Sequence, residues 1–120
     1  MTKEEVQMIS FKVIASSGEA FDEFVKAVNA ASDYDFAGAE EHMKSGEASM
    51  IEAHQEQTTL LNAEVRGEEL PFSIILIHSQ DHLMHAMTYE QNAKDMIQMY
   101  KALQASSEMK AESSLPRVVH

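Results

Sequence analysis

Three histidines and an aspartate recur at helical spacing within one short stretch of the chain, residues 71–89. His78, Asp81, His82 and His85 are related by steps of three, four and seven residues. On an α-helix these steps place all four side chains on one arc roughly 100° wide. Polar groups on an otherwise apolar helix cost stability unless they find partners. This arc is therefore the first place in the chain to look for chemistry.

Four interpretations of the arc are open from the residues alone. Each histidine could fill a half-buried structural position with one ring nitrogen satisfied. His78 and His82 could share a metal ion with Asp81, as in a metal-dependent hydrolase, although the glutamate of the zincin helix motif is absent. A neutral imidazole is also a nucleophile near its ordinary pKa of about 6.5, so His78 could accept a phosphoryl group. Lastly, the arc could recognise a partner protein.

A phosphoryl acceptor needs hydrogen-bond donors for the phosphoryl oxygens. His82 lies one helical turn from His78, and the Gln80 amide lies between them in sequence. The chain has neither a Walker loop nor the glycine loop of a kinase. We therefore expect no bound nucleotide and a phosphoryl group that arrives on another protein.

Composition narrows the class of protein. A length of 120 residues with 44% hydrophobic content predicts one globular domain, and a net charge of −11 argues against binding to nucleic acid or anionic membranes. The absence of cysteine excludes disulfides, thiolate zinc sites and thiol nucleophiles. With no secretion signal and no run of eighteen apolar residues, the sequence predicts a soluble cytoplasmic protein.

Strand signals are nearly absent, and three long helical patterns cover most of the chain. Thr2 and Glu5 form a capping-box pattern that starts the first helix near Lys3. The second helix is expected at about residues 36–66 and the third at about residues 71–103. Because the connections are short, the fold class is all-α, an antiparallel up-down-up three-helix bundle.

Two further expectations concern local structure. Ser16, Ser17 and Gly18 weaken the middle of the first helix, which predicts a kink or a close helix crossing there. After Leu103 the apolar periodicity stops, so we divide the chain into a domain, residues 1–103, and a polar C-terminal tail, residues 104–120, that we expect to be mobile.

The apolar surface exceeds what one bundle can bury. Ile74 to Ile77 are four consecutive apolar residues that point in all directions around the third helix, and two partner helices cannot surround them. We predict a homo-oligomer with the third helix central; the alternative is an exposed patch on a monomer. In a cyclic oligomer Asp81 would form a ring of like charges that requires a cation or a shared proton.

Three segments carry a resemblance to a known family. HSQDHLMHAMT at residues 78–88, EAHQEQTTLL at residues 52–61 and the Arg66-Gly67-Glu68 link resemble the IIA component of the lactose/cellobiose family of the bacterial sugar phosphotransferase system. The resemblance implies a homotrimer of three-helix bundles, nine helices in all. It also implies that His78 accepts a phosphoryl group from the phosphocarrier HPr and passes it to a cysteine of the cognate IIB protein, which phosphorylates a disaccharide during uptake through IIC.

The resemblance also implies roles for single residues. Asp81 lies near the three-fold axis and binds a divalent metal ion, for which we expect magnesium, while His82 helps to hold the phosphoryl group. His54 and Gln57 fall on the matching part of the second helix and are expected to line the pocket from the adjacent subunit, together with the Gln80 amide named above. Contact with the membrane is expected only through IIB and IIC. A trimeric helical module that binds or regulates without transferring phosphate is the alternative.

The sugar is not determined at this level, because a IIA protein need not contact it. Lactose, cellobiose and chitobiose systems are all compatible with the motif. His85 is not a motif position, so no role is carried over to it.

Overall fold

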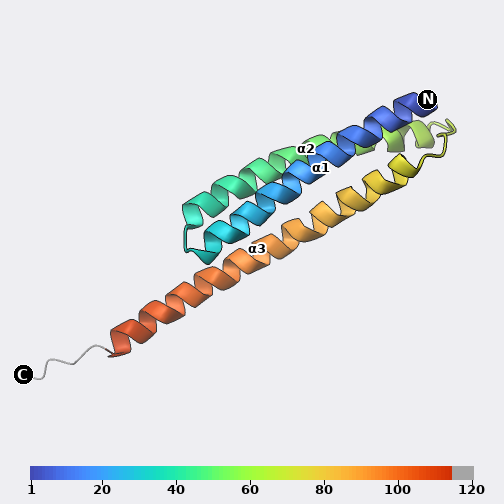
Figure 1. The fold of residues 1–120 in the computed structure, drawn as a ribbon. Helices are drawn as coiled ribbons and strands as arrows, with labels where there is room; N and C mark the ends of the chain where they lie inside the picture. The colour runs from blue at the N-terminus through green and yellow to red at the C-terminus, as the bar shows by residue number, and fades with distance from the viewer. Residues whose placement is uncertain (115–120) are drawn as a thin grey trace, which may run out of the picture.

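The structure is a computed structural model of the chain that describes residues 1–114. Those residues form three α-helices, α1 (Lys3–Ser32), α2 (Phe36–Val65) and α3 (Ile74–Ser114), and contain no strand. Figure 1 shows each helix running back along the one before it. The predicted all-helical, three-helix architecture is confirmed. No helix among the described residues is long and apolar enough to cross a bilayer.

Three helix ends are fixed by residues whose types suit them. The Glu5 N–H donates to Thr2 Oγ1 (3.1 Å) and the Thr2 N–H donates to Glu5 Oε1 (3.2 Å), so the predicted capping box starts α1. The Gly38 N–H donates to Asp35 Oδ1 (3.0 Å), which caps α2. Gly67, at φ 86°, follows α2 in the left-handed conformation that glycine tolerates best.

The helix α1 is the centre of the fold. It packs along both other helices, whereas α2 and α3 touch each other at few places. Its buried side chains, such as Val13, Ala20 and Phe24, recur at steps of three, four and seven residues and meet Met50 from α2 and Leu83 from α3 in one core. The bundle is thus open along the side where α2 faces α3.

The close crossing predicted at Ser16 to Gly18 does not lie at Gly18. The helix α1 is uninterrupted there, and a methyl group added at Gly18 would meet nothing within 4 Å outside its own helix backbone. The close crossing lies instead at Gly46 of α2, where an added methyl group would collide with the ring of Phe24. Gly46 of α2 has no side chain and so leaves room for the Phe24 ring of α1. This lets the two helices approach closely.

Both predicted ends of α3 were wrong. The helix begins at Ile74 and not at Pro71, because Ser73 takes the capping position: its carbonyl accepts from the Ile77 N–H (3.4 Å). It also continues past Leu103 to Ser114. Residues 104–114 contain no proline or glycine and include good helix formers. The helix therefore continues although the apolar residues no longer recur at the spacing of a buried face.

The tail prediction is thereby corrected in part. Residues 105–113 are helical and all exposed, and residues 115–120 lie outside the described part of the chain. The division into a domain, residues 1–103, and a tail stays a prediction.

Candidate functional site

His78 and His82 form a pair on the surface of α3. Their Nε2 atoms lie 3.1 Å apart, their ring centroids 4.6 Å apart, and their planes meet at 76°. A hydrogen bond between two such nitrogens requires that one carries a proton and the other a lone pair. If His82 is the donor, the Nε2 lone pair of His78 is kept free of a proton, which is the state that a nucleophile needs.

The four residues of the predicted arc share one site. His78, Asp81, His82 and His85 line a shallow, open hollow of about 270 Å³. His78, Asp81 and His85 are exposed and His82 is half-buried, so a partner can reach the rings directly. The spacing argument therefore predicted the juxtaposition correctly. An imidazole enclosed within the bundle would have ruled out transfer between proteins.

Gln80 and Gln57 form a second polar contact, on another side of α3. Gln57 Nε2 donates to Gln80 Oε1 (2.6 Å) and Gln80 Nε2 donates to Gln57 Oε1 (2.8 Å), which ties α2 to α3 where they do approach. Neither amide lines the histidine hollow of its own chain. The predicted pocket roles of both therefore remain predictions, and the amides here position α3 against α2.

His54 is exposed on α2, and among the described residues its side chain has no hydrogen bond or ion pair. It does not line the hollow formed by its own chain. Within one copy the structure thus does not bring His54 to His78. The predicted contribution of His54 requires a second copy of the chain.

The remaining helical histidines have local partners. His85 packs against Phe21 of α1, with ring centroids 4.9 Å apart, and Phe21 in turn packs against Tyr89. His42 Nδ1 lies 2.8 Å from Glu23 Oε2, and this hydrogen bond is the main reason that the pKa of Glu23 is lowered. These contacts give both histidines structural roles between helices.

The possible metal ligands of one chain are His78, Asp81 and His82. The described residues contain no group of three or more histidine, aspartate or glutamate side chains placed to hold an ion, and the two Nε2 atoms at the site bond to each other. This does not support a hydrolase-type centre. Asp81 offers one exposed carboxylate that has no hydrogen bond or ion pair among the described residues. Such a carboxylate suits a hard divalent cation only where several copies contribute one each.

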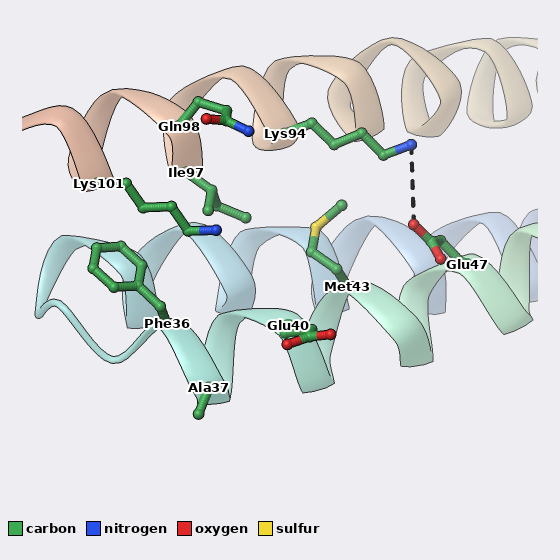
Figure 2. A pocket seen from close by; sticks show the side chains of 9 residues that line it. All are labelled: Phe36, Ala37, Glu40, Met43, Glu47, Lys94, Ile97, Gln98 and Lys101. Atoms are coloured by element: carbon green, nitrogen blue, oxygen red, sulfur yellow. Dashed lines mark ion pairs between the residues drawn. The ribbon is translucent and has the colours of Figure 1, made fainter.

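A groove larger than the histidine hollow lies elsewhere on the molecule. It has a volume of about 570 Å³ and lies between α2 and α3 on their open side. Figure 2 shows Lys94 reaching across to Glu47, with 3.9 Å between Nζ and Oε1, and Lys101 near the ring of Phe36. Lys94 is twelve residues beyond His82, roughly 18 Å along the helix. The groove therefore belongs to a different part of the molecule, and no motif predicted it.

Comparison with known proteins identifies the family of the chain. Residues 8–101 match the family model described as "PTS system, Lactose/Cellobiose specific IIA subunit". The lactose-specific EIIA component of Staphylococcus epidermidis is 38% identical over 101 residues, which cover 84% of this chain and 97% of that protein. The corresponding Staphylococcus aureus protein is 37% identical, covering 84% of this chain and 98% of its own length.

A solved structure agrees with this assignment. The crystal structure of the cellobiose-specific enzyme IIA from Bacillus anthracis superposes with a TM-score of 0.82 at 39% identity, covering 88% of this chain and 94% of the other. Fold, helix order and sequence therefore lead to the same family. The chain belongs to the lactose/cellobiose-specific IIA family of the sugar phosphotransferase system.

Proposed function

We propose that this chain is a phosphocarrier that receives a phosphoryl group from phosphorylated HPr on His78 and passes it to a cysteine of its cognate IIB protein, in the cytoplasm, during disaccharide uptake. The observation that carries the proposal is the exposed pair of imidazoles whose Nε2 atoms share one hydrogen bond at 3.1 Å. One ring can then act as the nucleophile while the other donates.

The first transfer follows from that pair. When His82 donates, the Nε2 lone pair of His78 attacks the phosphorus of the HPr phosphoryl group. The new P–N bond forms as the bond to HPr breaks, and HPr leaves with the electron pair. The Nε2–H of His82, released from His78, is then free to donate to a phosphoryl oxygen, and such donors stabilise the charge of the transferring group.

The second transfer reverses these roles. A thiolate of IIB attacks the phosphorus, the S–P bond forms, and the P–N bond breaks with its electron pair returning to His78 Nε2. His82 can again donate to that nitrogen. Because the site is an open hollow on one helix face, both partner proteins can use the same approach to the phosphorus.

We also propose that the working form is a homotrimer with α3 central. The exposed side chains Ile74, Ile77 and Met84 lie on the same side of α3 as Asp81, and a monomer would leave this apolar surface in water. Three copies of Asp81 would hold one divalent cation, for which we expect magnesium. The ion supplies positive charge that offsets repulsion among the three carboxylates.

The test uses phosphoenolpyruvate, enzyme I and HPr with the purified chain. We expect one phosphoryl group per chain in the wild-type protein and none in His78→Ala. The control is His42→Gln, which changes another histidine far along the chain, bonded to Glu23, and should accept the group as the wild type does. Equal uptake by His78→Ala would end the proposal. Normal partner binding by a chain that never takes up phosphate would favour the binding module instead.

A further inference from the structure

The helix α3 carries one exposed seam along its whole length. We define the seam as positions a and d of a heptad in which Ile74 is a and Ile77 is d. Every seam position from Ile74 to Glu112 is exposed, whereas the buried residues of α3, such as Leu83 and Ala93, occupy positions c and f and face the core. A period of 3.5 residues is the repeat of helices that pack along one another as coiled coils.

The last part of the seam lies beyond the segment shared with the family. The family match ends at residue 101, but α3 continues to Ser114. We call residues 102–114 the α3 extension. Figure 1 shows this end of α3 projecting past the turn between α1 and α2. Residues 105–113 are all exposed, and Met109 leaves 71% of its surface in water. Residues 105–113 are therefore not covered by the part of the chain that the structure describes.

The first three seam positions of the extension are apolar, as the seam of a coiled coil requires. Its seam positions are Ala102, Ala105 and Met109, followed by Glu112 at the last turn, and its remaining charges, Glu108 and Lys110, lie off the seam. Small side chains at a and d let helices approach closely, and Met109 adds an apolar contact. In contrast, the family-matched part of the seam includes the carboxylates Asp81 and Asp95.

A second copy of the same segment suits this surface better than an unrelated partner. The extension contains two glutamates and one lysine, a net charge of −1, against −11 for the chain, so it has little charge with which to steer a basic protein. Rotation about an axis along α3 would place each seam residue opposite its own copies. In a parallel arrangement Glu108 at position g would face Ser113 at position e, so within the extension like charges meet only at Glu112, the last seam position.

We propose that the α3 extension forms a parallel three-stranded coiled coil with the same segment of two other copies. This stalk prolongs the central contact of the trimer past the length shared by the family. The inference rests on the homotrimer proposed above, because only an assembly with α3 central aligns the three extensions. Its partner is thus a second and third copy of this chain.

Cysteine cross-linking tests the contact directly, because the chain has no cysteine of its own. Ala105→Cys places a thiol at seam position d, and Ser107→Cys places a matched thiol at position f, on the outside. Under mild oxidation at low protein concentration, we expect covalent dimers to form at least about tenfold faster in Ala105→Cys, because a disulfide requires Cβ atoms about 4 Å apart. Equal rates in a trimeric protein would overturn the stalk.

A truncated chain supplies an independent test. A stop after Leu103 removes the extension and leaves the family-matched residues whole. We expect its trimer to dissociate at a protein concentration at least about tenfold higher than that of the full chain, a change of one decade in affinity. An unchanged dissociation midpoint overturns the stalk, as does a full chain that is monomeric at every concentration. Phosphoryl uptake by the truncated chain, measured on the same samples, reports separately on the phosphocarrier function.

Discussion

At the scale of single residues, one shared proton determines what the site can do. His78 and His82 are bonded through Nε2 atoms 3.1 Å apart, so the pair works with one proton between these two nitrogens. A second proton would remove the lone pair from His78 and break the bond. Two residues of the same type therefore take different roles: one ring is the nucleophile and the other is the hydrogen-bond donor.

Replacing the donor should slow the transfer without unfolding the protein. His82→Ala removes the Nε2–H that would reach the phosphoryl oxygens, and loss of one such donor costs on the order of a hundredfold in rate. The measurement is the rate of phosphoryl uptake from HPr, followed by mass spectrometry after rapid quenching. His82→Gln keeps an amide donor and should recover part of the rate. Wild-type kinetics in His82→Ala would refute the donor role.

The Glu23–His42 contact predicts how stability changes with pH. Hydrogen bonding to His42 lowers the pKa of Glu23 in the folded chain, so this carboxylate stabilises the fold above its ordinary pKa of about 4.3. That contribution is lost as the pH falls through the lower, folded value. Unfolding free energies measured between about pH 6 and pH 3 should therefore decrease less in Glu23→Gln than in the wild type.

The control for this titration is Glu19→Gln, on the same helix but exposed and outside the His42 contact. It should follow the wild-type decrease. If Glu23→Gln and Glu19→Gln lose stability in parallel as acid is added, the hydrogen bond to His42 makes no contribution.

At the scale of the elements, one glycine sets how closely α1 and α2 approach. An added methyl group at Gly46 would collide with Phe24, and overpacking of this kind costs about 1–3 kcal/mol. Gly46→Ala should therefore lower the free energy of unfolding in urea. Gly18→Ala is the matched control: it adds the same methyl group where nothing lies within 4 Å, and should raise stability by up to about 1 kcal/mol. Shifts of the same sign would contradict the crossing.

The sequence predicted the elements well where local chemistry decides them. The capping box of Thr2 and Glu5 was visible as two residue types at fixed spacing. The sequence predicted the helices less well where contacts between helices decide their ends and crossings. Gly18 looked like a crossing because glycine weakens helices, but only the position of Phe24 shows that the crossing is at Gly46. The end of α3 was missed because the periodicity of core-facing residues reports burial within one chain, and residues 105–113 are all exposed.

At the scale of the whole molecule, the histidine arc was predictable and its surroundings were not. Helical spacing alone brings His78, His82 and His85 together on one helix. Whether His54 joins them depends on how copies of the chain pack, because within one chain it does not line the same hollow. Long-range contacts between chains leave no local pattern in sequence, so this part of the site required more than spacing.

The proposed trimer should survive the loss of the Asp81 carboxylates at its axis. In the proposed trimer, Asp81→Leu would replace three repelling charges with apolar side chains, and such exchanges are often neutral or stabilising by about 1–4 kcal/mol. Sedimentation velocity should therefore show a trimer with or without a chelator, whereas the wild-type trimer should weaken when the ion is removed. A monomeric Asp81→Leu would show that the ion is essential for assembly.

The most direct test of the account is the position of the phosphoryl group on the wild-type chain. After incubation with phosphoenolpyruvate, enzyme I and HPr, the protein should be fragmented under alkaline conditions and the modified residue read by tandem mass spectrometry. We predict a single phosphoryl group on His78, with His54, His82 and His85 unmodified. A phosphoryl group on any other residue, or none at all, would contradict the account.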